Sequence, residues 1–174
     1  MDVVASHPET VGTPSPDTDP GRGMVESIHI ADLAGSPMRP AARVRAIADV
    51  GLEGDRYATV AGHYSGDAKD DRQITLIEAE EIEAFTARTA NELAPGETRR
   101  NVTTRGIRLN ALVGRRFRIG PVECEGTRLC EPCQYLVDLL GKPVLEPLVH
   151  RAGLRARILT GGEITLGDEV VALD

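Results

Sequence analysis

The sequence predicts a mainly β domain of the α+β class, in which a barrel-like mixed sheet carries a few helices on its outside. Three observations favour this class. Short segments of alternating apolar and polar residues outnumber helical segments, Gly, Pro and Asp punctuate them, and helices do not separate the strands regularly. Regular alternation of strands and helices would instead indicate a doubly wound parallel sheet. The expected sheet is therefore mainly antiparallel.

The 174 residues are expected to form one domain, residues 24–174, behind a disordered tail, residues 1–23. The tail contains four prolines and almost no large apolar side chain, so it cannot bury enough surface to fold. Met24 directly precedes the first alternating segment and is therefore a candidate internal translation start.

Strand predictions rest on the alternation of apolar and polar residues between turn signals. Glycines in segments 160–163 and 166–169 predict tight hairpin turns near the carboxyl end, because glycine reaches positive φ at little cost. The predicted strands are 25–31, 43–48, 72–77, 116–119, 122–128, 154–160 and 169–173.

Three helices are predicted. The clearest covers about 78–92, with acidic residues in its first turn and Ile82 and Phe85 at helical spacing. A second helix begins near Pro132 and ends at Gly141, which suits a glycine cap. The third covers 146–152 and stops at the following glycine.

Charge and composition exclude several classes of protein. The net charge of −7 argues against a general nucleic-acid binder, and no apolar run is long enough to span a membrane. Three cysteines, an odd number, and the absence of a signal peptide predict a cytoplasmic location. The sequence contains eighteen arginines but only two lysines. Seven of the arginines fall within 99–118, and this cluster suggests a small anionic ligand. Arg116 and Arg118 fit a solvated strand face equally well.

The segment Cys130-Glu131-Pro132-Cys133 is the strongest candidate for chemistry. Pro132 suits the first helical position, which places Cys133 in the first turn, where free N–H groups and the helix dipole favour a thiolate. Arg128 adds to this effect. A thiolate there can act as a nucleophile or as a ligand for a soft metal.

Other interpretations of the two thiols remain open. Both can be small buried hydrophobic residues, as Cys124 is expected to be on the apolar face of its strand. A structural zinc site would need about two more ligands, from His150, His63 or His29. A thioredoxin-like pair is disfavoured because the βαβ pattern is missing.

Two further segments carry polar candidates. Asp55 and Arg56 follow a glycine-framed loop, and they either pair to fix that loop or face a pocket. Arg99 and Asn101 together offer a fork for phosphate and an amide that can read the edge of a heterocycle.

Six segments, taken in order, resemble the MOSC family, which is named for the C-terminal domain of molybdenum cofactor sulfurases. The resemblance runs from about residue 25 to the carboxyl end, and the order is more specific than any one segment. The segments are GLEGDR at 51–56, DRQITLI at 71–77, RRNV at 99–102, LVGRRFRIG at 112–120, RLCEPC at 128–133 and GLRARIL at 153–159.

The resemblance implies a MOSC-type mixed β-barrel with a few peripheral helices, as a stand-alone single-domain member. It also implies that Cys133 either carries sulfur as a persulfide or ligates molybdenum in a pterin cofactor. Cys130 is then a neighbour that resolves a persulfide or merely packs. The residues that the resemblance places at the anionic cofactor are Arg99, Asn101, Arg128, Asp55, Arg56 and Arg72.

Two departures from larger members of the family shape the expected function. The chain shows no separate N-terminal barrel and no desulfurase domain, so sulfur or electrons would come from a cysteine desulfurase or an electron-donor protein. Tyr57 stands where many relatives have a histidine. The resemblance implies a molybdenum-cofactor-binding or sulfur-carrier domain. Such a domain can be part of a reductase of N-hydroxylated compounds. The alternatives are a carrier module without turnover and a zinc-stabilised barrel.

Overall fold

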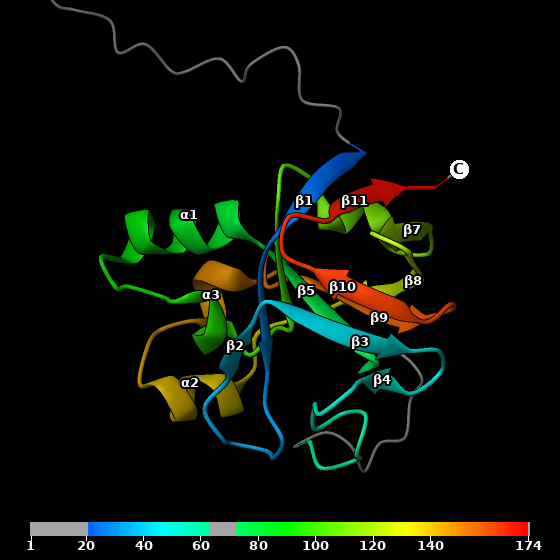
Figure 1. Ribbon diagram of the computed structural model, residues 1–174. Coiled ribbons are helices and arrows are strands. Elements are labelled where there is room, and N and C mark those ends of the chain that lie inside the picture. Colours follow the sequence, from blue (N-terminus) through cyan, green and yellow to red (C-terminus); the bar gives the residue numbers. More distant parts are fainter. Residues whose placement is uncertain (1–20, 63–71, 174) are drawn as a thin grey trace, which may run out of the picture.

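The computed structural model describes residues 21–62 and 72–173, and its central feature within those residues is a closed barrel of seven strands (Figure 1). Pairing of β1 with β11 closes the ring. The β5–β6 pair is parallel and the other barrel pairs are antiparallel, which confirms the predicted mixed barrel. In ring order the strands are β11 (Glu169–Ala172), β7 (Arg116–Ile119), β8 (Val122–Leu129), β9 (Leu154–Ile158), β5 (Ile74–Glu78), β6 (Val102–Arg105) and β1 (Arg22–Ile30).

Short strands extend the barrel. β2 (Arg39–Ala41) pairs with the end of β1, and β3 (Arg43–Ile47) forms a separate small sheet with β4 (Gly51–Leu52) and β10 (Gly162–Thr165). The two predicted hairpin pairings are therefore wrong, because β10 pairs with β3 while its chain neighbours β9 and β11 belong to the barrel. The tight turn predicted at 166–169 is present, with Gly167 at φ 84° and the N–H of Asp168 donating to the carbonyl oxygen of Thr165 at 3.1 Å. The glycines at 161–162 serve close packing instead, since a Cβ on Gly161 would lie 2.9 Å from the carbonyl oxygen of Ala46.

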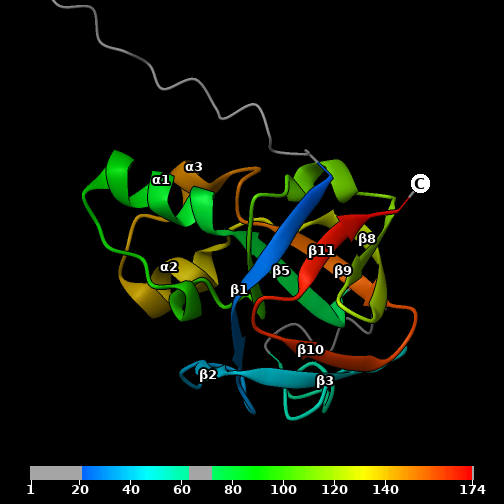
Figure 2. The same cartoon turned by 45° about the horizontal axis from the view of Figure 1, so that its top comes forward.

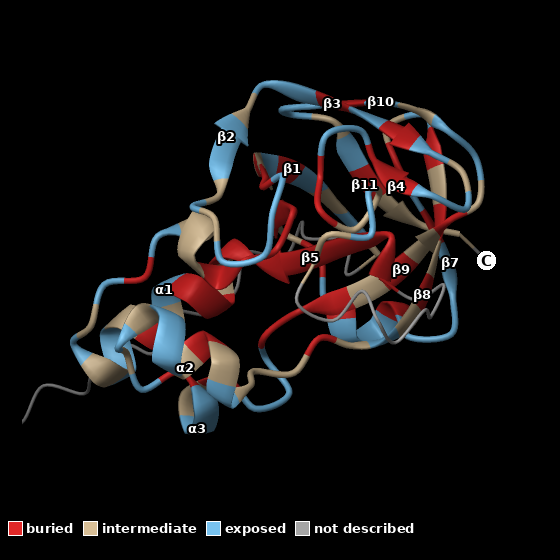
Figure 3. Ribbon diagram, turned by 90° about the horizontal axis from the view of Figure 1, so that it is seen from below, coloured by how far each residue is buried: buried red, intermediate tan, exposed pale blue. Residues whose placement is uncertain are grey.

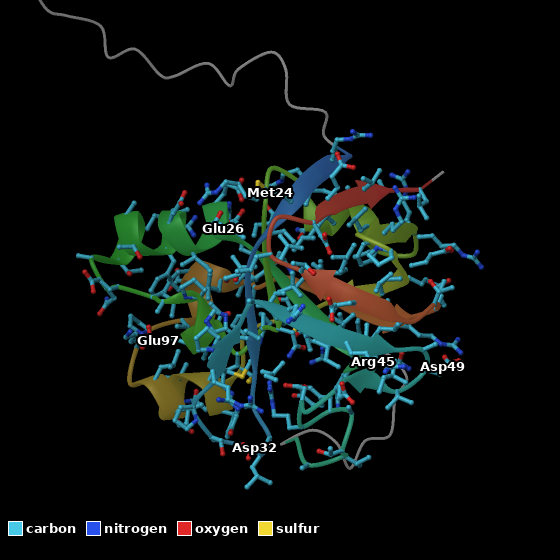
Figure 4. The ribbon with its side chains drawn as sticks, viewed as in Figure 1. Met24, Glu26, Asp32, Arg45, Asp49 and Glu97 are labelled. Atoms are coloured by element: carbon cyan, nitrogen blue, oxygen red, sulfur yellow. The ribbon has the colours of Figure 1, made fainter. Side chains whose placement is uncertain are left out.

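Three α-helices of the described residues gather on one side of the barrel (Figure 2). They are α1 (Ala79–Thr89), α2 (Gln134–Leu140) and α3 (Leu145–Leu148), accompanied by the short 3-10 helices η3 (Pro95–Thr98) and η4 (Leu109–Leu112). In α1 the predicted inner residues Ile82 and Phe85 are buried. Arg105 of β6 links this helix to β1 by ion pairs with Glu83 and with Glu26, which Figure 4 labels.

The boundaries of all three helices differ from the prediction, and α1 ends at Thr89 rather than near 92. α2 begins at Gln134 rather than near Pro132, and Cys133 is its extended N-cap residue (φ −142°) rather than part of its first turn. α3 ends at Leu148, before the predicted end at 152. The reason is local, because His150 takes a left-handed backbone conformation (φ 58°) and donates its N–H to the Glu131 carboxylate at 2.9 Å. Gly141 caps α2 as predicted.

The core has two parts that meet at β5. Ile74 and Leu76 pack inside the barrel, whereas Ile77 packs under the helices with Phe85 and Leu136. Strand β5 is therefore buried along its whole length, as Figure 3 shows. Burial of each such side chain contributes about 1.5–3 kcal/mol.

The last residues of the predicted tail, residues 1–23, belong to the first strand of the barrel. Strand β1 already includes Arg22 and Gly23, which pair with Val171 and Val170 of β11. Residues 1–20 and His63 lie outside the described residues. No helix in the described part of the chain is both long and apolar enough to cross a membrane.

Candidate functional site

A pocket lies where the loop after β8 meets η3 and the loop after β4, and we call it the cysteine pocket. Its volume is about 70 Å³. Cys130, Cys133 and two tyrosines, Tyr57 and Tyr135, form part of its wall. Among the described residues, five arginines also line it: Arg56, Arg72, Arg99, Arg100 and Arg155. The barrel thus brings together both predicted cysteines and three of the predicted arginines, Arg56, Arg72 and Arg99.

Arg99 is the residue whose environment points most directly to an anionic ligand. It is the left-handed C-cap of η3, and it is 8% exposed. Its Nη1 donates to the carbonyl oxygen of Ser36 at 2.5 Å, whereas its buried Nη2 has no hydrogen-bond partner. Burial, and secondly the charge of Arg56, lower the pKa of Arg99. A buried guanidinium nitrogen without an acceptor is costly, so an anion in the pocket would stabilise it.

Asp55 holds Arg56 at the pocket. The Asp55 carboxylate is fully buried and accepts hydrogen bonds from the N–H groups of Ala31 and Tyr57 and from Arg56 Nη1, the last at 3.1 Å. Arg56 Nη2 donates to the carbonyl oxygen of Arg99 at 3.1 Å. The structure therefore realises both alternatives for these two residues: they pair, and Arg56 also lines the pocket. Asp55 does not itself line the pocket among the described residues, but it holds Arg56 in the pocket wall.

Arg100, which the sequence did not single out as a site residue, fixes the cysteine loop. Its guanidinium donates to the carbonyl oxygens of Thr98, Cys130 and Ala152 at 2.9–3.0 Å. Cys130 is 5% exposed, and its N–H donates to the carbonyl oxygen of Gly153 at 2.8 Å. The sequence indicates this role of Arg100 only through its position next to Arg99.

The two cysteines of the loop differ in access. Cys130 is buried, whereas Cys133 is half-buried and lies at the start of α2. None of the three cysteines forms a disulfide. The geometry therefore makes Cys133 the thiol that a ligand or reagent in the pocket can reach.

Asn101 and Arg128 do not line the pocket among the described residues. Asn101 is fully buried, and its side chain joins two strands by accepting from Thr75 N–H at 3.1 Å and donating to the carbonyl oxygen of His29 at 3.2 Å. Arg128 has an exposed side chain on β8. Arg155, in contrast, is a pocket residue that the sequence placed only within a matching segment.

The described residues contain no group of three or more His, Cys, Asp or Glu side chains arranged to hold a metal ion. Of the histidines proposed for zinc, His150 pairs through Nδ1 with Glu131 at 2.9 Å, and His63 falls outside the described residues.

Thiol labelling should separate the cysteines. Burial raises the pKa of Cys124 to about 12 and excludes reagents from it. We expect iodoacetamide at pH 8 to modify Cys133 of the folded protein and to modify Cys124 only after denaturation. Peptide mass spectrometry of partially labelled protein checks this order. Equal labelling of the two cysteines in the native state would contradict the assigned burial.

Known proteins resemble this chain in sequence pattern and in fold. The family model of the MOSC domain matches residues 62–171. A search of curated protein sequences finds no match. Among solved structures, the YUAD protein from Bacillus subtilis superposes with a TM-score of 0.73 at 18% identity, covering 86% of this chain and 94% of that chain.

Two structures of YiiM are similar as well. YiiM from Geobacillus stearothermophilus has a TM-score of 0.68 at 17% identity, over 87% of this chain and 75% of that chain. YiiM from Escherichia coli has a TM-score of 0.63 at 16% identity, over 89% of this chain and 71% of that chain. At these identities the likeness concerns the fold alone.

Proposed function

Because this chain belongs to the MOSC domain family, we propose that it binds a molybdenum cofactor in the cysteine pocket, with Cys133 as the metal ligand. The family is associated with molybdenum cofactor sulfurases and with reductases of N-hydroxylated compounds. The observation that carries the proposal is that the pocket brings Cys133 together with several arginines, among them Arg99, whose buried Nη2 has no protein acceptor.

The residues of the pocket fit such a group. A cysteine sulfur is a soft ligand, which suits a soft metal centre, and arginine forks suit the phosphate of a pterin cofactor. Arg56, Arg99 and Cys133 all line this pocket, so they can contact one ligand together. When bound, the cofactor would supply two-electron exchange at molybdenum.

The chain's own residues hold this arrangement in place. Arg100 fixes the carbonyl oxygens of the cysteine loop, and the Asp55 carboxylate orients Arg56. Both contacts are buried, so they are formed before any ligand enters and reduce the cost of ordering the site. The reaction we propose is reduction of an N-hydroxylated compound, which takes two electrons and two protons and releases water. A separate donor protein supplies the electrons.

Replacement of Arg99 tests the anionic site. We expect Arg99→Gln, produced in a host that makes the cofactor, to retain about ten- to a hundredfold less molybdenum during dialysis, because a charge-assisted hydrogen bond is worth about 1.5–3 kcal/mol. Elemental analysis of molybdenum per chain is the measurement.

Arg118→Gln is the matched control, because Arg118 is exposed on β7 and is not among the pocket residues. Equal losses in the two variants would contradict the proposal, as would native protein without molybdenum. A persulfide on Cys133 of metal-free protein would instead favour a sulfur-carrier role with a cysteine desulfurase.

A further inference from the structure

The loop between β1 and β2, residues 32–38, lies between two pockets, and we call it the strap. Figure 4 labels its first residue, Asp32. Ala34 lines the cysteine pocket, whereas other strap residues line a neighbouring pocket of about 410 Å³, namely Gly35, Pro37 and Met38. Arg99 lines both pockets, so the strap and Arg99 together form part of the partition between them.

With the strap in this position, the cysteine pocket is smaller than most ligand sites. Its volume of about 70 Å³ lies below the range of about 300–1,000 Å³ that is typical of small-molecule sites. A cofactor that carries a phosphate and a ring system therefore enters only if part of the wall moves. Because the strap lines both pockets, its displacement would open the cysteine pocket toward the larger space beside it.

Other parts of the pocket wall are fixed by buried contacts. Arg100 holds the cysteine loop through the carbonyl oxygen of Cys130, and the buried Asp55 carboxylate holds Arg56. In the strap, by contrast, residues 32–35 and 37 are exposed. A segment that buries little surface opens locally at low cost. The strap is therefore the part of the described wall that moves most easily.

Both ends of the strap are anchored. Before it, Arg56 N–H donates to the carbonyl oxygen of Ala31 at 2.6 Å, and Ala31 N–H donates to the Asp55 carboxylate at 3.1 Å. After it, Arg39 of β2 pairs with Ile30 of β1. Opening would therefore lift the middle of the strap while its ends stay in place.

Three residues in the middle of the strap are hydrogen-bonded to other described segments. Two of these bonds come from arginines of the cysteine pocket. The bonds join Ala34 N–H to the carbonyl oxygen of Ala61 at 3.0 Å, Arg99 Nη1 to the carbonyl oxygen of Ser36 at 2.5 Å, and Arg56 Nη1 to the sulfur of Met38 at 3.2 Å. The side chains that hold the strap closed are thus the ones that would bind an anion.

Arg99 connects the strap with the anion site. Its Nη1 donates to Ser36, whereas its buried Nη2 has no hydrogen-bond partner. An anion that accepts a hydrogen bond from Nη2 would fix the guanidinium and, through Nη1, the closed strap. Because such coupling is reciprocal, whatever stabilises the closed strap also favours the bound anion.

We infer that the strap is a lid on the cysteine pocket, which opens to admit an anionic ligand and is fastened by Arg99 once the anion is bound. The inference rests on the proposed function only for the identity of the complete ligand. Closure itself requires an anion and no metal, so it can be measured with inorganic phosphate on the metal-free full chain.

Hydrogen exchange of single amide groups, measured by NMR, reports opening of the strap. Ala34 N–H is released when its bond to Ala61 breaks, and Ala90 N–H, at the end of α1, serves as the control. We expect saturating phosphate, compared with chloride at equal ionic strength, to slow exchange at Ala34 at least about tenfold and to leave Ala90 unchanged. Unchanged exchange at Ala34, or equal slowing at both amides, would overturn the inference.

Arg99→Gln removes the proposed fastening. We expect exchange at Ala34 to become at least about tenfold faster, because a charge-assisted hydrogen bond is lost, and the effect of phosphate to disappear. Arg118→Gln changes an exposed arginine of β7 outside the cysteine pocket and should behave as the wild-type protein does. A strap that still responds to phosphate in Arg99→Gln would show that Arg99 does not fasten it.

Gly35→Ala loosens the strap and leaves both arginines in place. Gly35 has φ +75°, and a Cβ there would lie 3.5 Å from the Tyr135 hydroxyl, which is an ordinary contact. We expect exchange at Ala34 to become about tenfold faster, because the left-handed conformation disfavours a residue with a Cβ, while phosphate still slows it. Loss of the phosphate response in Gly35→Ala would contradict the coupling through Arg99, even if Arg99→Gln fails to fold.

Molybdenum content separates this inference from the proposed function. A chain that acquires no molybdenum in a cofactor-competent host, but whose strap responds to phosphate, would support the lid and contradict the proposed cofactor. Molybdenum-containing protein whose Ala34 N–H exchanges as fast as in the metal-free chain would contradict the lid and leave the proposed function standing.

Discussion

Cys133→Ala is expected to lower the molybdenum content of the protein by at least about a hundredfold. Loss of a supporting contact around a metal ligand commonly costs about 10–100-fold in affinity, and loss of the ligand itself costs at least as much. Among the described residues, the pocket has one other thiol, Cys130, which is buried and held by its backbone to Gly153. Elemental analysis of protein from a cofactor-competent host gives the ratio directly.

Cys124→Ala is the matched control for this experiment. Cys124 lies in the barrel core and does not line the pocket, so its replacement removes a thiol without touching the site. We expect molybdenum content to stay at the wild-type level in this variant. Cys133→Ala that keeps its molybdenum would mean that the arginines alone hold the cofactor, and the proposed ligand would be wrong.

Gly153→Ala is expected to have the largest effect on stability, a loss of more than about 4 kcal/mol in the free energy of unfolding or no folded protein at all. A Cβ at this position would lie 1.8 Å from the carbonyl oxygen of Leu76, and the backbone has φ +103°. The clash is with β5, the strand on which both parts of the core meet. The backbone at Gly153 cannot move away from β5, because the Gly153 carbonyl oxygen also accepts a hydrogen bond from the N–H of Cys130.

Gly141→Ala separates the two causes. Gly141 also has a positive φ, of 62°, but a Cβ there would meet nothing within 4 Å. Its replacement by alanine should lower the free energy of unfolding by only about 1–2 kcal/mol, which is the cost of a left-handed backbone conformation for a residue with a Cβ. Urea unfolding of both variants measures the difference. Similar losses at the two positions would show that backbone conformation, and not the contact with Leu76, makes Gly153 necessary.

The strand predictions succeeded for β7 and β8, where one face is buried, and also for the fully buried β5, but they missed β10. β7 and β8 alternate buried and more exposed residues, which is the signal that a sequence displays. β6 was missed because its first three residues are all buried, so no alternation marks it. β2 and β4 were missed because they contain only three and two residues.

Arg128 shows why a site is harder to predict than a strand. Alternation from Val122 would place Arg128 on the buried face of β8. The register of β8 against β9 shifts between Gly126 and Arg128, and this irregularity turns the Arg128 side chain outward. A shift of one residue reverses the face of each side chain after it, and the sequence carries no clear sign of it.

The sequence by itself determined the barrel class, most of its strands, and Cys133 as the cysteine to test, because alternation, turn residues and the order of matching segments are local properties. Only the tertiary structure decided which side chains share a pocket. Arg56, Arg99 and Arg155 come from distant segments, and closure of the barrel brings them into one pocket with the cysteine loop. That convergence depends on strand register, bulges and close glycine packing, which are interactions between segments rather than properties of any one of them.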